Sequence, residues 1–298
     1  MSALRNKLFF KKYKLQKLIY TGNCSLVYQG INLINKEPIA IKLEKRNENY
    51  YFLESEAFLL FYLKGFGIPK LISFGKSAQF KILIEELLGA SLNSLMANKK
   101  DKNNRLKNVC MIALQVLDRL EFIHSKNIIH RDIKEANFVI GRNENNKIIY
   151  LIDFGFAKKY RSSRTGKHIK FKNTKMAWGS LHCMSINANR TFEQSRRDDL
   201  ESAGYMLILL AKLYVPWLEI VKSNTIDFLT KFNKVLKLKL TTTPEQLCKG
   251  LPEEFTKYVQ YCRGLEFEQD PDYDYLRSLF TSILMKNNQK NDYNFFGS

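Results

Sequence analysis

Cysteine, proline and tryptophan are scarce in this chain, with 5, 6 and 2 residues among 298. The cysteines are odd in number and show no paired spacing, which argues against a disulfide framework or a zinc site and favours a reducing compartment. Long apolar runs are also missing, because the most apolar stretch, Tyr205 to Ala211, is far too short to span a bilayer. The N-terminal residues mix aromatic and basic side chains and do not resemble a signal peptide. We therefore expect an intracellular protein, cytoplasmic or nuclear, with no membrane span.

Acidic residues are few compared with basic ones: 29 Asp and Glu against 48 Lys and Arg give a net charge of +19. Such a charge attracts polyanions, which include nucleic acid, acidic or phosphorylated protein, and anionic membrane. No zinc finger, recognition-helix or RNA-binding motif accompanies the charge, so nucleic acid is not favoured as a primary partner. With 45% hydrophobic residues, the chain can form two lobes of ordinary size, each with its own core.

The hydrophobic pattern changes near Gly89. Before it, apolar and polar residues alternate as in half-buried strands, for example from Ile39 to Leu43, and one helix is predicted at about 52–63. After it, apolar residues recur every three or four positions from Val109 to Ile123, which predicts a long helix with one apolar face. We expect an α+β fold in a single domain over 1–298, with a small β-rich lobe (about 1–86), a hinge (about 86–89) and a larger, mainly helical lobe (about 90–298).

The most informative motif is His130-Arg131-Asp132-Ile133-Lys134-Glu135-Ala136-Asn137, followed by Asp153-Phe154-Gly155 at the end of an apolar strand. These side-chain types suit phosphoryl transfer, which depends mostly on positioning and charge neutralisation. In the protein-kinase signature, the Asp of the first block accepts the proton of the substrate hydroxyl, and its Asn and the Asp of the second block hold Mg²⁺. Asp132 is therefore predicted to be the catalytic base, with Lys134 near the transferred phosphate. Asn137 and Asp153 are predicted to bind Mg²⁺.

A nucleotide site is predicted from the first lobe. Lys42 ends the run Ile39-Ala40-Ile41-Lys42, which matches the kinase strand whose Lys contacts the phosphates of ATP. Its partner is expected to be a Glu on the following helix; Glu54 and Glu56 both qualify by position, and Glu54 is preferred. Of the three glycines that would let backbone N–H groups approach the phosphates, only Gly22 is present. The predicted ATP contacts are Ile19, Gly22, Val27, Ala40, Lys42, Glu86, Leu88, Val139 and Asp153.

Further segments carry a family resemblance: His124-Ser125-Lys126-Asn127, Ala157-Lys158-Lys159-Tyr160-Arg161, Ser185-Ile186-Asn187 and Glu193-Gln194-Ser195-Arg196-Arg197-Asp198-Asp199-Leu200-Glu201-Ser202. They closely resemble the casein kinase 1 family, over about 13–293. The Ser-Ile-Asn triplet is telling, because most protein kinases have Ala-Pro-Glu there. The Glu-Gln-Ser-Arg-Arg-Asp-Asp run separates the chain from the related vaccinia-type kinases. The resemblance implies ATP, Mg²⁺ and transfer of the γ-phosphate to Ser or Thr of acidic or phosphorylated protein substrates.

The resemblance also implies a basic site on the large lobe that recognises negative charge on the substrate. Lys158 and Lys175 match two of the family's anion-binding positions, and His182 stands where the family has Arg. An imidazole near its ordinary pKa is mostly neutral at pH 7 and cannot form the bidentate contact of Arg with phosphate. We therefore expect weaker use of phosphate priming than in the family.

Other departures from the family support an alternative function. Glu135-Ala136 replaces Pro-Asp in the catalytic loop, and Glu85 falls at the apolar gatekeeper position, where a carboxylate costs desolvation energy unless it is paired. No long regulatory tail is expected. The alternative is a pseudokinase, which uses the same fold as a binding scaffold with weak or no phosphoryl transfer. An active Ser/Thr protein kinase is preferred, because the residues predicted to carry the chemistry are all present.

Overall fold

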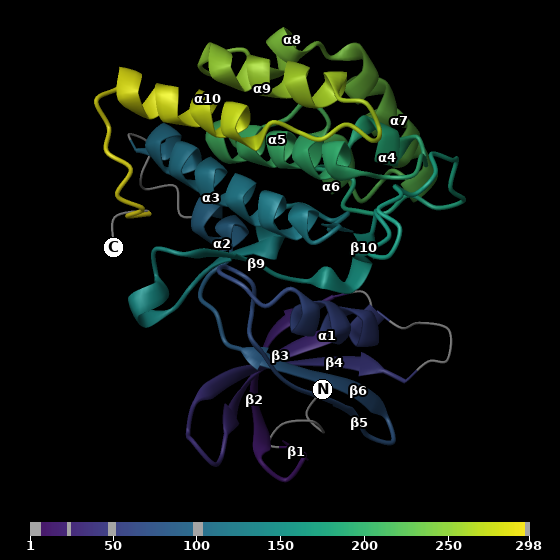
Figure 1. Ribbon diagram of the computed structural model, residues 1–298, viewed down its shortest axis with the longest axis vertical. Helices are drawn as coiled ribbons and strands as arrows, with labels where there is room; N and C mark the ends of the chain where they lie inside the picture. The colour runs from purple at the N-terminus through teal and green to yellow at the C-terminus, as the bar shows by residue number, and fades with distance from the viewer. Residues whose placement is uncertain (1–6, 23–24, 47–51, 98–103, 296–298) are drawn as a thin grey trace.

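The structure, a computed structural model, describes residues 7–22, 25–46, 52–97 and 104–295. A small lobe with a curled antiparallel sheet lies at the bottom of Figure 1, and a larger helical lobe lies above it. The predicted bilobal α+β fold is therefore confirmed. None of the described helices combines the length and the apolar character that a membrane crossing needs.

The small lobe consists of a six-stranded sheet, ordered β1-β2-β3-β4-β6-β5, and one helix. Its elements are β1 (Leu8–Phe9), β2 (Tyr13–Thr21), β3 (Ser25–Asn32), β4 (Pro38–Lys45), α1 (Phe52–Tyr62), β5 (Leu71–Lys76) and β6 (Phe80–Glu86). Strand β4 lies between β3 and β6, where Lys42 is opposite Val27 on one side and Leu83 on the other. A central strand of this kind holds its side chains in fixed directions.

Alternate side chains of strand β4 point into two different parts of the protein. Ile39, Ile41 and Leu43 are buried in a small hydrophobic cluster on one face of the sheet. The intervening residues face the other way, because successive side chains of a strand point to opposite faces. Helix α1 covers this second face, and its buried residues belong to the large core that continues through the helical lobe. Lys42 is thereby directed towards α1 and the boundary between the lobes.

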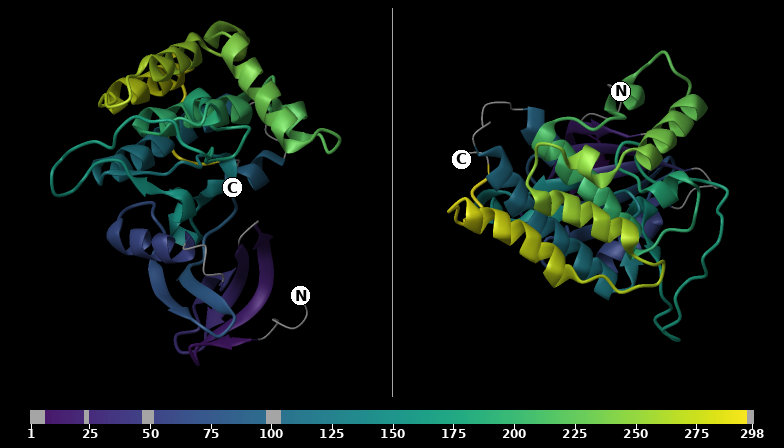
Figure 2. Two further views of the ribbon diagram at one scale, coloured as in Figure 1. Left: turned by 90° about the vertical axis from the view of Figure 1, so that its right-hand side faces the viewer. Right: turned by 90° about the horizontal axis from the view of Figure 1, so that it is seen from above.

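The large lobe has helices packed around α3 and α5, as Figures 1 and 2 show. Its helices are α2 (Leu92–Ala97), α3 (Arg105–Ser125), α4 (Ile186–Asn189), α5 (Arg196–Lys212), α6 (Leu218–Lys222), α7 (Phe228–Thr241), α8 (Pro244–Cys248), α9 (Glu253–Gly264) and α10 (Tyr273–Lys286). Its short strands are β7 (Ile128–Ile129), β8 (Phe138–Ile140), β9 (Ile149–Leu151) and β10 (Lys158–Lys159). Its described residues also include the 3₁₀ turns η2 (Glu135–Asn137), η3 (Asn143–Asn145) and η4 (Phe154–Phe156).

Helix α3 is the long helix predicted from the apolar repeat between Val109 and Ile123, and these residues are almost entirely buried. The predicted catalytic blocks lie between the lobes, in the turns next to β7, β8 and β9. The basic segment between β10 and α4 projects from the helical lobe in both views of Figure 2. The fold thus places the predicted chemistry in short, well-packed connections, with the basic segment beside them.

Candidate active site

A buried ammonium group joins both lobes. Lys42 Nζ lies 2.7 Å from Glu56 Oε2 and 2.6 Å from Asp153 Oδ1. Burial opposes the charged form of Lys42, but the two carboxylates outweigh burial and raise its pKa. The side chain is therefore positively charged at neutral pH. The predicted meeting of Lys42 and Asp153, distant in sequence, is present.

The carboxylate that meets Lys42 on α1 is Glu56, so the preferred partner, Glu54, is wrong. Glu54 instead contacts Lys76 and Lys81, at 2.7 and 2.8 Å. The reason is helical geometry: Glu56 follows Leu53 by three residues and therefore shares its buried face. The same spacing is visible in the sequence and would have identified Glu56.

Glu54 still has a structural role at the start of α1. The Lys81 ammonium is buried and also contacts Glu44 Oε1, at 2.9 Å. The other oxygen of Glu44 accepts a hydrogen bond from the backbone N–H of Leu53. Glu44, Lys81 and Glu54 therefore fasten the first turn of α1 to the sheet, which helps to fix the direction of the helix.

Asp153 precedes η4 and has a left-handed backbone, with φ of 66°. Such a conformation is costly for a non-glycine residue and is concentrated at functional sites. Burial opposes ionisation of its carboxyl, but Lys42 outweighs burial and lowers the pKa of Asp153 to about 2. The side chain retains 39% of its exposure, so a carboxylate stays open towards the space between the lobes.

The catalytic loop forms a compact polar network around Asp132. Lys134 Nζ donates to Asp132 Oδ2 at 2.7 Å and to Ser180 Oγ at 2.9 Å. Ser180 Oγ donates to Asp132 Oδ1 at 2.8 Å. Asn137 Nδ2 donates to the Asp132 backbone oxygen and, at 3.2 Å, to Oδ2. Ser180 was not anticipated from the sequence, because no spacing rule links it to the catalytic loop 46 and more residues earlier.

Asp199, from α5, holds the backbone of this loop. Its two carboxylate oxygens accept the consecutive N–H groups of His130 and Arg131, at 2.7 and 2.8 Å. It also contacts the Nε2 of His124 at 3.0 Å. His130 in turn contacts the backbone oxygen of Ile152 and the N–H of Asp132 through its ring. Through these contacts, His130 and His124 help to hold the backbone of the loop in place.

The oxygen donors present suit Mg²⁺. The amide oxygen of Asn137 and the carboxylate of Asp153 are hard ligands, which this ion prefers. Because Asn137 uses its amide nitrogen for Asp132, its oxygen is the atom that would bind a metal. Asn137 and Asp153 thus offer oxygen ligands of the kind that the predicted Mg²⁺ site needs.

A cavity of about 180 Å³ lies between the lobes at these residues. Of the predicted ATP contacts, Gly22, Lys42 and Asp153 line it. The predicted catalytic residues Asp132 and Lys134 also line it, as does Glu56, the alternative partner of Lys42. The lining residues that were not predicted are Tyr20, Thr21, Ser25, Glu44, Phe52, Leu53, Gly155 and Phe156. The tip of the glycine-poor loop, residues 23–24, lies outside the described residues.

The remaining predicted ATP contacts do not line this cavity. They lie on the neighbouring strands and hinge: Ile19 on β2, Val27 on β3, Ala40 on β4, Glu86 and Leu88 at the hinge, and Val139 on β8. The described cavity is lined by the residues predicted to contact the phosphates, and both the phosphate and the adenine contacts stay predictions.

Two of the three predicted anion-binding side chains are already paired. Lys158 Nζ lies 2.8 Å from Glu193 Oε1, whereas Lys175 is exposed. His182 Nε2 lies 3.2 and 3.1 Å from the two oxygens of Glu135. A substrate phosphate at this site would compete with Glu193 and Glu135.

The expectation of a neutral His182 is wrong. The adjacent Cys183 sulfur and then the Glu135 carboxylate raise the pKa of His182, against the effect of burial. Burial raises the pKa of the Cys183 thiol, so Glu135 is the negative charge present at pH 7. His182 is therefore an imidazolium whose charge is balanced within the protein.

The model of the protein kinase domain matches residues 13–290 of this chain. The chain belongs to the protein kinase domain family. The match covers both lobes and every residue of the polar network described above. The kinase domain family uses ATP and protein substrates, and the cavity between the lobes is the candidate site for this chemistry.

Glu85, the residue predicted to stand at the gatekeeper position, has a carboxyl group in a buried setting. Glu85 lies on β6 opposite Ala40 of β4. Burial, followed by the nearby Glu56 carboxylate, raises the pKa of Glu85 to about 8. The group is thus mostly protonated at pH 7, which reduces the desolvation cost that the sequence indicated.

The two glutamates of α1 provide a matched test. Glu56→Gln should lower the rate of phosphate transfer by about 10²-fold, because displacement of Lys42 misaligns the phosphates. Glu54→Gln should change the rate by less than about fivefold, since Lys81 keeps its contact with Glu44 and Glu54 does not touch Lys42. Transfer rates at saturating ATP check both. Equal losses in the two variants would contradict the assignment of Glu56.

Glu85 predicts a pH dependence of stability. Because its folded pKa, about 8, exceeds the ordinary value of 4.5, the folded state takes up a proton between these values, and the stability contributed by Glu85 falls as pH rises through this window. Glu85→Leu should therefore stabilise the protein more at pH 8 than at pH 5. Urea unfolding at both pH values measures this. The exposed Glu219→Gln is the control, and an equal effect of Glu85→Leu at both pH values would refute the prediction.

Proposed function

We propose that this chain is an active ATP- and Mg²⁺-dependent Ser/Thr protein kinase of the casein kinase 1 type. One observation carries the proposal: Lys42 contacts Glu56 and Asp153 at the same time. In kinases this pairing, together with the metal-binding Asp, has to be in place for phosphoryl transfer. The side chains that phosphoryl transfer requires are thus already in contact, which favours an active kinase over a pseudokinase scaffold.

The nucleotide is proposed to bind between the lobes. Lys42 neutralises the α- and β-phosphates, and Gly22 with the neighbouring loop backbone covers them. Asn137 and Asp153 would hold Mg²⁺, which neutralises the developing charge when bound. The adenine is proposed to lie among apolar side chains and to meet backbone groups of the hinge: Ile19, Val27, Ala40, Leu88 and Val139 around the ring, and Glu86 and Leu88 at its edge.

The acceptor hydroxyl is proposed to bind at Asp132. The carboxylate accepts the hydroxyl of Ser180 at 2.8 Å, so an O–H group fits this position. In the proposed reaction Asp132 orients the substrate hydroxyl and accepts its proton, while the Lys134 ammonium stabilises the charge of the moving phosphoryl group. The Lys134 ammonium lies close enough to the proposed reaction for this role, because it already contacts both Asp132 and Ser180.

Acidic or phosphorylated proteins are the proposed substrates. The segment from Phe156 to Met176 contains eight Lys or Arg residues and no acidic residue. Several of these cations are exposed beside the candidate site, so a negative segment is attracted there. Because Glu135 engages His182, and Glu193 engages Lys158, we propose that priming phosphate is used more weakly than in the casein kinase 1 family.

Radiolabel transfer from ATP to casein tests this function. The wild-type protein should label casein, and Asp132→Asn should reduce the rate by at least about 10²-fold, because the variant cannot accept the hydroxyl proton. Binding of a fluorescent ATP analogue should be nearly unchanged in the variant. Nucleotide binding without casein labelling by the wild type would instead identify the pseudokinase scaffold.

A further inference from the structure

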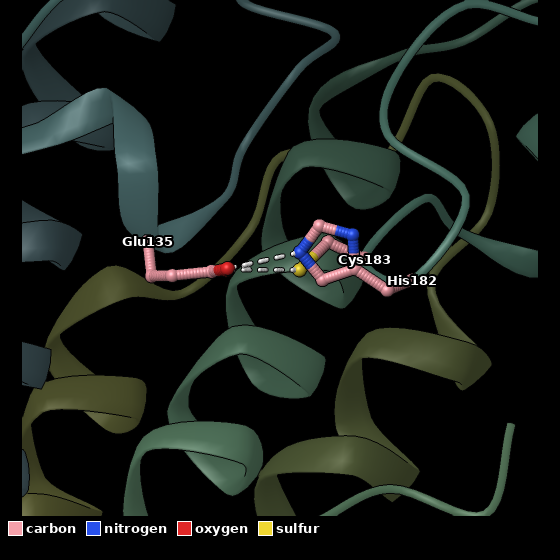
Figure 3. A group of neighbouring side chains, drawn as sticks. All are labelled: Glu135, His182 and Cys183. Carbon is pink, nitrogen blue, oxygen red and sulfur yellow. Dashed lines mark hydrogen bonds and ion pairs between the residues drawn. The ribbon is translucent and has the colours of Figure 1, made fainter. Parts of the chain in front are cut away.

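Three side chains of types that can bind metals, Glu135, His182 and Cys183, lie next to one another, as Figure 3 shows. None of the three lines the cavity of the candidate active site. Glu135 comes from η2, directly after Lys134 in the catalytic loop, and His182 and Cys183 come from the turn before α4. The His182 ring and the Cys183 sulfur both face the Glu135 carboxylate. Their ligand atoms all lie within 4.8 Å of one another.

The two distances from the Glu135 carboxylate to its neighbours are close to those of a tetrahedral metal site. Zinc with bonds of 2.0–2.3 Å to nitrogen, oxygen and sulfur places its ligand atoms roughly 3.3–3.6 Å apart. Here Nε2 of His182 and Oε2 of Glu135 are 3.1 Å apart, and Sγ of Cys183 and the same oxygen are 3.8 Å apart. Movements of a few tenths of an ångström bring both pairs to the metal-bound spacing.

The turn that carries two of the ligands is held rigidly from behind. Lys239 of α7 is buried and donates to the backbone oxygens of Leu181 and Met184, at 2.9 and 2.7 Å. Trp217 Nε1 donates to the backbone oxygen of His182 at 2.8 Å. A site whose supporting contacts are already formed loses little entropy when a ligand binds.

We propose that Glu135, His182 and Cys183 form a binding site for Zn²⁺ or a similar borderline-soft divalent ion. A thiolate and an imidazole select zinc over Mg²⁺, which prefers oxygen ligands. Three protein ligands leave the fourth position for water or an added ligand. The side chains of His182 and Glu135 keep 17% and 11% exposure, which leaves a path for the ion.

The spacing of the cysteines could not predict this site, because its ligands lie on separate segments of the chain. Glu135 is 47 residues from His182 and 48 from Cys183. Rules based on spacing detect sites whose ligands are close in sequence. The fold brings these two segments together.

A bound ion would fasten the catalytic loop to the turn that contacts it. Glu135 is adjacent to Lys134, and Ser180, which contacts both Asp132 and Lys134, accepts the backbone N–H of Cys183 through its carbonyl. The metal would therefore link the catalytic loop, through Glu135, to the turn that carries Ser180. These two segments both contact the proposed acceptor position. Because the thiol and the imidazolium lose protons to the solvent on binding, affinity should increase with pH.

Cobalt binding tests the proposal independently of any phosphoryl transfer. The full chain, freed of metal with a chelator and then dialysed, is titrated with Co²⁺. We expect one equivalent to give the ultraviolet charge-transfer band of a thiolate–cobalt bond, and Zn²⁺ to abolish it by displacement. Mg²⁺ in large excess should not abolish it.

Variants assign the ligands. Cys183→Ser should remove the band, and His182→Gln and Glu135→Gln should weaken Zn²⁺ binding by at least the ~100-fold that even outer-shell changes produce. Cys248→Ser, at another buried cysteine, is the matched control and should bind as wild type does. Circular dichroism confirms that each variant is folded. The proposal is overturned if the wild type binds less than one equivalent at micromolar Co²⁺, or if folded Cys183→Ser retains the band.

Discussion

A single buried ammonium, that of Lys42, determines the arrangement of both lobes. A charge of this kind is tolerated in the interior only when partners offset its desolvation, and the loss of one partner leaves an uncompensated charge. Lys42 has two, Glu56 from α1 and Asp153 from the turn after β9. The direction of α1, the left-handed backbone at Asp153 and the position of β4 are therefore mutually dependent.

Two departures from the casein kinase 1 pattern are connected in space. Glu135 in the catalytic loop and His182 before α4 each look like the loss of a family residue when read along the sequence. In the structure they form an ion pair, so the new acid and the changed base compensate one another. This pairing keeps both charges satisfied in a part of the protein where an isolated charge would be costly. It also explains why neither change disturbs the contacts of Asp132, Lys134 and Asn137.

The sequence was sufficient for the fold and for the residues nearest the proposed chemistry. The α+β bilobal architecture, the long helix α3 and the convergence of Lys42 with Asp153 followed from periodicity and from local motifs. Such signals work because they depend on neighbours along the chain. The choice between Glu54 and Glu56 was accessible in principle, since the buried positions of α1 recur every three or four residues.

Other features depend on contacts between remote segments and have no local signal. The protonated state of His182 depends on Glu135, and the role of Ser180 depends on how the turn before α4 meets the catalytic loop. The partner of Lys158, Glu193, lies 35 residues away. The sequence shows how many basic side chains the protein has. It does not show how many of them are paired with acidic side chains in the folded protein.

The division of the hydrophobic interior has a consequence for local opening. The outer face of the sheet has a small cluster of its own, whereas α1 shares the large core of the helical lobe. Asp199 anchors the backbone of His130 and Arg131 to α5, deep in that core. Regions with few buried contacts open at lower free energy than the rest. The outer strands β1, β2 and β3 are therefore expected to exchange their amide hydrogens sooner than the loop of Asp132, so that local opening would begin at the outer edge of the small lobe.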